Sequence, residues 1–173
     1  PYIEDLVQQI MDAHDGITEQ EFFQTLFHQP VNSPFQMFLD TDGAQSFHKY
    51  ACDLIDSDMI TGLQIYMDFP PQSVRLFTDD LTKDYFSSMT KARGTYWYGI
   101  FQGTQQSSLF CPSFYLGERE KEAYGDLAYI TATTFYYQGE ARQAYIAIYS
   151  SSEHFTDMLK DNLTITDSVS YII

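Results

Sequence analysis

The chain has 173 residues, 44% hydrophobic and 17% aromatic, which suits one globular domain, or a domain and a fragment of another, with a substantial core. Its net charge of −15 and pI near 4.3 would repel phosphate backbones and anionic lipid headgroups, which argues against nucleic-acid and membrane-surface binding. No run reaches the length of a membrane-spanning helix, and no signal-peptide pattern opens the sequence.

The first third of the chain is predicted to be helical. Apolar residues recur at helical spacing over residues 2–11, 18–28 and 44–55, so each segment has one apolar face. The second segment starts with Thr18 three residues before Glu21, the spacing of a capping box. We therefore expect three amphipathic helices before residue 60.

From residue 60 the hydrophobic pattern becomes alternating, which indicates strands. Residues 60–68 predict a first strand and residues 74–78 a second, short one. Residues 79–90 are interpreted as a helical connection, and residues 95–102 as the most aromatic strand of the chain.

The second half is predicted to contain a charged loop and a long hairpin. Residues 117–122 are expected to form a solvated loop. Strands at 127–137 and 142–149 flank Gln138-Gly139-Glu140, a three-residue hairpin connection. Alternation of Ala144, Ile146 and Ile148 with Tyr145, Ala147 and Tyr149 indicates a half-buried strand, and three serines, Ser150, Ser151 and Ser152, then favour a helix start.

Helices followed by about five strands with helical connections predict an α+β fold. In this fold the N-terminal helices pack on a mostly antiparallel five-stranded sheet.

Few residues suggest catalysis or metal binding. Cys52 and Cys111 are too few for a disulfide scaffold and are not spaced for metal, so we expect unpaired thiols. The four histidines are scattered, and residues 40–43 favour a turn over a calcium loop because later ligands are missing. Neither a catalytic motif nor a phosphate-binding loop is found. We expect no enzyme activity, no metal and no cofactor.

One cluster of residue types could bind a small molecule. A guanidinium among aromatic rings can fix a carboxylate by two parallel hydrogen bonds while the rings enclose the rest of the ligand. The alternative is that the rings form the core and rim of the sheet, with the arginine on the surface. The cluster consists of Arg93, Tyr96, Trp97 and Tyr98 in ARGTYWYG, and of Phe114 and Tyr115 in CPSFYL.

The order of these elements resembles the extracellular Cache domains of bacterial sensor histidine kinases. The matching pieces cover residues 60–162: ITGLQIYMD, VRLFTDD, KARGTYWYG, AYGDLAYITATTFYYQGEARQAYIAIYSS and SEHFTDMLKDN. The resemblance implies a five-stranded antiparallel PAS-like sheet at 60–162, with 1–59 as the N-terminal helical segment of the same lobe. It also implies that LTITDSVSYII, at 163–173, opens a membrane-proximal second lobe, as in double Cache sensors.

The resemblance further implies a function. The lobe would bind a small molecule at the extracellular face of the bacterial cell membrane, without catalysis, and signal to a kinase of a two-component system. A homodimer through the N-terminal helices is a further expectation. Both ends of the sequence look cut from a longer polypeptide, so the membrane would be reached only through segments outside this chain.

Ligand-binding positions of the family fall on Arg93, Trp97, Tyr98 and Tyr115, and Tyr96 belongs to the same cluster. Amino-acid-binding Cache sensors carry an acidic residue near the end of the last strand, where this chain has Ile148-Tyr149. Amino-acid recognition is therefore not expected unless Asp126 takes that role. A carbohydrate, an organic acid or a peptide is an equal expectation.

Two other classes of protein remain open. A secreted or lipid-anchored binding module would also bind a small molecule but would have a single anchor. An acidic interaction protein of the immunity type would face a basic protein partner and ignore small molecules.

Overall fold

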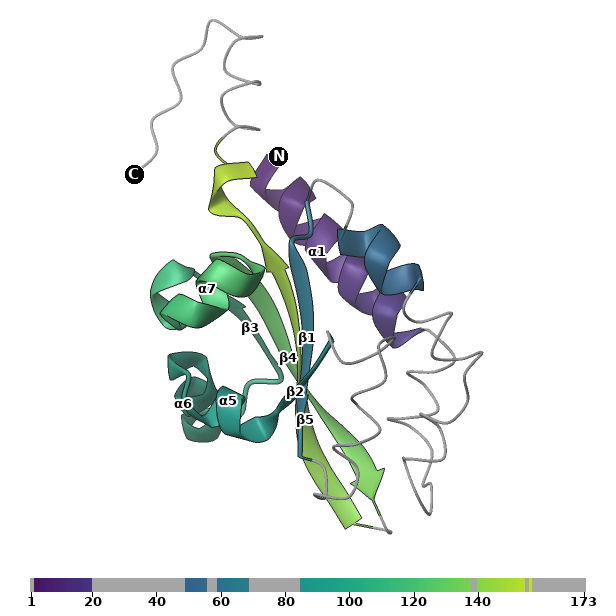
Figure 1. Ribbon diagram of the computed structural model, residues 1–173, viewed down its shortest axis with the longest axis vertical. Helices are drawn as coiled ribbons and strands as arrows, with labels where there is room; N and C mark the ends of the chain where they lie inside the picture. The colour runs from purple at the N-terminus through teal and green to yellow at the C-terminus, as the bar shows by residue number, and fades with distance from the viewer. Residues whose placement is uncertain are drawn as a thin grey trace, which may run out of the picture.

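The structure is a computed structural model that describes residues 2–19, 49–55, 59–68, 85–137, 140–154 and 156 (Figure 1). Within these residues the chain forms helices and strands in mixed order, as expected for an α+β fold. The elements are α1 (Tyr2–Thr18), β1 (Gly62–Met67), β2 (Phe86–Ser88), α5 (Met89–Arg93), α6 (Tyr96–Gly103), β3 (Ser108–Cys111), a 3-10 turn (Ser113–Tyr115), α7 (Glu118–Tyr124), β4 (Leu127–Tyr137) and β5 (Glu140–Ser150). Residues 49–55 are also helical.

The strands form one open five-stranded sheet in the order β2-β1-β5-β4-β3. β4 and β5 pair antiparallel along their full lengths, which confirms the predicted hairpin. Glu140 already pairs with Tyr137, so it belongs to β5 and not to the connection. β1 runs parallel to β2, with Tyr66 opposite Ser87, and the sheet is therefore mixed where the resemblance implied a purely antiparallel one.

Helices cover both faces of this sheet. α1 and the helix at 49–55 lie on one side, and α5, α6 and α7 lie on the other (Figure 1). Alternate residues of β5 enter the two cores: Ile146 and Ile148 face α1, whereas Tyr145 and Tyr149 face α6 and α7. The predicted alternation is correct, but the prediction of a half-buried strand is wrong because both faces are covered.

The α1 side of the core rests on the amphipathic pattern of the sequence. Ile10, Ala13 and Ile17 of α1 are buried against the sheet at a spacing of three or four residues. The helix predicted for 2–11 is confirmed and continues to Thr18. Thr18 is the last residue of α1, and its hydroxyl donates to the carbonyl oxygen of Asp15 at 2.9 Å. The capping-box contact expected between Thr18 and Glu21 lies outside the described residues.

Several predicted features lie outside the described residues. They are the remainder of the helix at 18–28, the first residues of the helix at 44–55, the turn at 40–43, the strand at 74–78 and the segment 163–173. None of the helices in the described ranges is long and apolar enough to cross a membrane.

The prediction of a strand at 95–102 is wrong, because residues 96–102 lie in helix α6 and Thr95 is its N-cap. The hydroxyl of Thr95 accepts a hydrogen bond from the backbone N–H of Tyr98 at 3.3 Å and so caps the helix. Trp97 and Phe101, four residues apart, are then buried on the same side. Aromatic residues favour strands, but here the cap and the four-residue spacing decide the structure.

The prediction of a loop at 117–122 is also wrong, because residues 118–122 lie in α7 and Gly117 is the N-cap of this helix. Glu118 and Lys121 form an ion pair at 2.6 Å across one turn of this helix. Gly62 lets α7 approach β1, since a Cβ there would lie 2.9 Å from the Cβ of Tyr124. The helical connection predicted for 79–90 is correct for residues 89–90, which lie in α5, and wrong for residues 86–88, which form β2. Residues 79–84 lie outside the described ranges.

Candidate ligand-binding cavity

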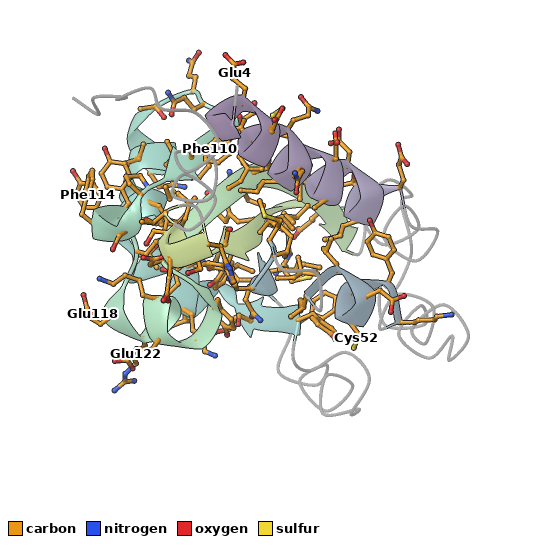
Figure 2. The ribbon with its side chains drawn as sticks, turned by 90° about the horizontal axis from the view of Figure 1, so that it is seen from above. Glu4, Cys52, Phe110, Phe114, Glu118 and Glu122 are labelled. Carbon is orange, nitrogen blue, oxygen red and sulfur yellow. The ribbon has the colours of Figure 1, made fainter. Side chains whose placement is uncertain are left out.

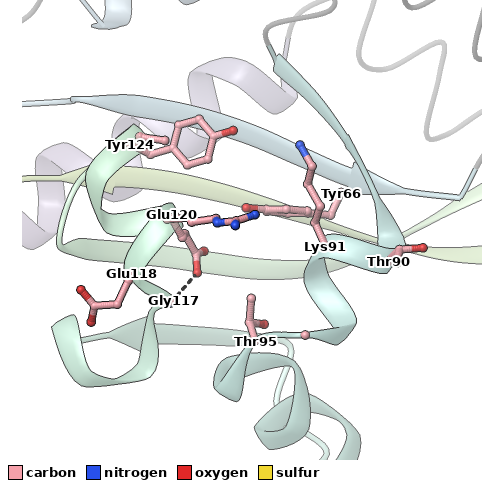
Figure 3. A pocket seen from close by; sticks show the side chains of 11 residues that line it. Tyr66, Thr90, Lys91, Thr95, Gly117, Glu118, Glu120 and Tyr124 are labelled. Atoms are coloured by element: carbon pink, nitrogen blue, oxygen red, sulfur yellow. Dashed lines mark hydrogen bonds between the residues drawn. The ribbon is translucent and has the colours of Figure 1, made fainter.

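A cavity of about 690 Å³ lies on the α5–α7 side of the sheet, a volume that suits a small organic ligand (Figure 3). α5 and the turn after it form one wall, α7 forms the opposite wall, and β1 contributes Tyr66. The lining residues are Tyr66, Thr90, Lys91, Gly94, Thr95, Gly117, Glu118, Arg119, Glu120, Ala123 and Tyr124.

Glu120 is a buried carboxylate at this cavity, with only 8% of its surface exposed. Its Oε1 accepts hydrogen bonds from Trp97 Nε1 at 3.1 Å and from the Tyr149 hydroxyl at 2.5 Å. Its Oε2 accepts the backbone N–H of Gly117 at 3.1 Å, the contact drawn in Figure 3. Neutral donors from three parts of the chain thus hold the carboxylate, as burial of a charge requires.

Two tyrosines extend this network into the sheet. The hydroxyls of Tyr66 and Tyr149 are 2.8 Å apart, and because Tyr149 donates to Glu120, Tyr66 donates to Tyr149. The pKa of both hydroxyls is raised above the ordinary value of 10.0, mainly by burial and also by neighbouring negative charge. Both tyrosines therefore keep their protons and remain donors at neutral pH.

Cys111 lies in the same core and is fully buried. Burial and the charge of Glu120 raise the pKa of its thiol to about 12. A thiol with such a pKa is a poor nucleophile at neutral pH. Cys52 and Cys111 are both free, which confirms the expectation of unpaired thiols.

Two cations, Lys91 and Arg119, line the cavity and are exposed. Neither has an ion-pair partner within the described ranges. Glu118, next to Arg119, pairs with Lys121. Its side chain points outward from α7, as does that of Glu122 (Figure 2). The cavity lining therefore carries the buried carboxylate of Glu120, the exposed carboxylate of Glu118 and two exposed cations.

The predicted anchor Arg93 does not line this cavity. It is exposed and pairs with Asp68 at 2.8 Å. The pKa of Arg93 is raised, mainly by the side-chain interaction with Tyr98 and also by the charge of Asp68. Arg93 and Tyr98 line a different, smaller cavity of about 240 Å³, together with Asp68, Met89, Arg142 and Gln143.

The aromatic residues predicted for the site are in different environments. Trp97 is fully buried, and its ring centroid lies 5.3 Å from that of Tyr145. It does not line the cavity but donates a hydrogen bond to Glu120, which does. Tyr96 is 65% exposed and stacks on Tyr115 at 5.2 Å. Phe114, 74% exposed, lies at the outer edge of the molecule (Figure 2). The alternative interpretation, with tryptophan in the core and arginine on the surface, matches these positions.

Asp126 is hydrogen-bonded to Ser152 and not to one of these aromatic residues. Its carboxylate accepts hydrogen bonds from the backbone N–H of Ser152, at 2.6 Å, and from the Ser152 hydroxyl. Burial alone would raise the pKa of Asp126, but these hydrogen bonds outweigh it and lower the pKa below 3.8. Asp126 thus stabilises the helical turn that follows β5, where the sequence predicted capping by serine residues.

Sequence reasoning missed the residues that line the cavity. Glu120 stood in a charged segment, and its burial depends on Trp97 and Tyr149, which are distant in sequence. One signal was available, because glycine is a favoured N-cap residue and Glu118 and Glu120 place acidic side chains in the first turn that would follow Gly117. The described residues include no group of three or more metal-binding side chains.

The fold and the site define an α+β domain with an open five-stranded mixed sheet, helices on both faces and, on one of them, a cavity that contains the buried carboxylate of Glu120. Comparison of the chain with known protein families, with curated proteins and with solved structures gave no match.

Proposed function

We propose that this chain is the small-molecule-sensing domain of a membrane-bound bacterial sensor histidine kinase, with a PAS-like lobe of the Cache kind at the extracellular face of the membrane. The domain itself carries out no catalysis. One observation supports the proposal above the others: the cavity of about 690 Å³ contains a buried carboxylate, Glu120, that is hydrogen-bonded to the sheet.

The contacts of Glu120 suggest how a bound molecule would be sensed. A ligand that reaches Glu120 competes with, or strengthens, its hydrogen bond to Tyr149 of β5. The neighbouring residue Ile148 lies in the core on the other face of the same strand, with Ile10 and Ile17 of α1. The sheet therefore lies between the cavity and α1, and we propose that ligand binding shifts the position of α1.

A thermal-shift screen of the whole chain against small metabolites tests binding. A ligand at about 100 times its Kd adds roughly 2.7 kcal/mol to stability, which raises Tm by roughly 5 to 10 °C. Ala123→Trp fills the cavity from an exposed position of α7 and should abolish the shift. Glu122→Trp, on the outer side of α7, is the matched control and should retain it.

Arg93→Ala separates the two candidate cavities. Because Arg93 lines the smaller cavity and not the one that contains Glu120, this variant should bind the ligand with unchanged affinity. Loss of binding in Arg93→Ala, with binding retained in Ala123→Trp, would move the site to the cluster predicted from the sequence.

Hydrogen exchange tests the sensing step. Saturating ligand should change amide exchange in α1 as well as in α5 and α7. A ligand that protects only α5 and α7 would leave a binding module without a sensor function. A chain that binds no small molecule and captures a basic protein would be an interaction protein of the immunity type.

A further inference from the structure

Some of the described lysines and arginines form ion pairs with other described residues, and others do not. Arg93 pairs with Asp68, Lys121 with Glu118, and Arg142 with Glu140. Lys49, Lys91 and Arg119 have no such partner within the described ranges, and of these three Lys91 and Arg119 line the cavity beside Glu120.

This arrangement is unexpected in so acidic a chain. With 24 acidic and 9 basic residues, carboxylates greatly outnumber the cations available to pair with them. Two cations that have no ion-pair partner among the described residues, one from α5 and one from α7, nevertheless lie at one cavity. Glu118 and Glu120 line the same cavity, but Glu118 is paired with Lys121, so Lys91 and Arg119 offer an anion a local attraction within an otherwise acidic chain.

We propose that the cavity binds an organic monoanion, whose carboxylate lies between Lys91 and Arg119. The body of the ligand packs against the rings of Tyr66 and Tyr124, which line the inner part of the cavity (Figure 3). The guanidinium of Arg119 supplies a planar pair of donors for the carboxylate, and Lys91 supplies a point charge. This inference rests on the proposed function and specifies the ligand class of the same site.

Glu120 limits the charge that the ligand can carry. A dianion such as a phosphate monoester would be repelled by the buried carboxylate and by the net charge of −15. A monoanion carries less charge, so both this repulsion and the cost of removing the charge from water are smaller. Oε2 of Glu120 accepts one hydrogen bond from the described residues, so a hydroxyl or N–H group at the far end of the ligand fits there.

Calorimetric titration of the whole chain with three matched probes tests the charge requirement. The probes are 4-hydroxyphenylacetate, its neutral amide and 4-hydroxyphenyl phosphate. We expect the carboxylate to bind at least roughly tenfold more tightly than the amide and the phosphate, and to weaken as NaCl rises from about 50 to 500 mM.

Variants locate the anion. Lys91→Gln and Arg119→Gln should each weaken carboxylate binding by roughly tenfold and leave amide binding unchanged. Lys49→Gln removes an exposed cation that does not line the cavity and should have no effect. Because Lys91 and Arg119 are exposed and form no ion pair with another residue that the structure describes, the Tm of each unliganded variant should equal that of the native chain.

Each contrary result identifies a different error. Carboxylate affinity that survives both substitutions, or amide affinity equal to that of the acid, overturns the inference. Tighter binding of the phosphate overturns the monoanion class. Absence of binding by any carboxylate up to about 10 mM, while neutral ligands bind the native chain but not Ala123→Trp, overturns the inference and leaves the proposed function standing. Absence of cavity-dependent binding by every class overturns both.

Discussion

The indole Nε1 of Trp97 donates a hydrogen bond to Oε1 of Glu120 at 3.1 Å, and both side chains are buried. The same oxygen also accepts the hydroxyl of Tyr149, so one carboxylate joins α6, α7 and β5. This contact links the wall of the cavity to the core of the sheet.

Replacing Glu120 should therefore destabilise the fold. Glu120→Ala leaves the Trp97 and Tyr149 donors buried without an acceptor, and we expect a loss of about 2 to 4 kcal/mol in the free energy of unfolding. Glu120→Gln keeps one acceptor oxygen and should lose about half as much. Urea denaturation measures both.

The control for this experiment is on the same helix. Glu122→Ala removes an exposed carboxylate of α7 and should change stability by less than about 0.5 kcal/mol. Equal stability of the Glu120→Ala and Glu122→Ala variants would show that the buried hydrogen bonds contribute nothing measurable.

Stability should fall in alkali because of Cys111. The pKa of its thiol is raised from 9.0 to about 12 in the folded protein, so the unfolded chain loses this proton first. The resulting stabilisation is complete below pH 9 and is lost as the pH rises toward 12. Between about pH 9 and pH 10 the loss from this thiol should be about 1 kcal/mol.

The measurement is the free energy of unfolding at several alkaline pH values in the native chain and in Cys111→Ala. The variant loses stability at every pH because it removes buried volume, but its decline from about pH 9 to pH 10 should be smaller by the thiol contribution. The tyrosines of the network add their own loss above pH 10. Parallel declines in the two proteins would contradict the raised pKa.

Gly125 should not tolerate a side chain. Its φ is 142°, and a Cβ would collide with the carbonyl oxygen of Ser150 and the hydroxyl of Thr61. Gly125→Ala should cost about 2 kcal/mol or more. Gly99→Ala is the matched control, because a Cβ at this helical position of α6 meets no atom within 4 Å and should stabilise the helix by about 0.5 to 1 kcal/mol. Thermal unfolding compares the two variants, and similar Tm values would refute the expected contrast.

Asp126 should contribute through the helical turn after β5. Asp126→Ala removes the acceptor for the Ser152 N–H and hydroxyl, and should lower stability at pH 7 by about 1 kcal/mol. The lowered pKa of Asp126 means that this contribution is present above pH 3.8 and is lost as the pH falls through the folded value. The native chain and the variant should therefore converge in acid.

Asp126→Asn provides the control, because an amide oxygen still accepts from Ser152 but does not titrate. Its stability at neutral pH should lie between those of the native chain and the alanine variant. A difference between native chain and Asp126→Ala that stays constant from neutral pH into strong acid would exclude the hydrogen-bonded carboxylate as its source.

The sequence predicts those parts of the fold in which local pattern and tertiary burial agree. α1 follows from its apolar spacing, β1 from its alternation, and the β4–β5 hairpin from two long strands around Gly139. The α+β class and the unpaired cysteines also follow from the sequence. For the helix and the strands, a short window of residues contains the pattern that indicates the element.

The tertiary structure alone decided the identity of α6 and α7, the parallel pairing of β1 with β2, and the composition of the cavity. Aromatic residues at 96–98 fit a strand or a helix, and the choice depends on which side of Trp97 the sheet can bury. A glutamate in a charged segment is exposed unless distant donors surround it, as Trp97 and Tyr149 surround Glu120. Burial of such groups depends on contacts between segments far apart in the chain, which no local pattern records.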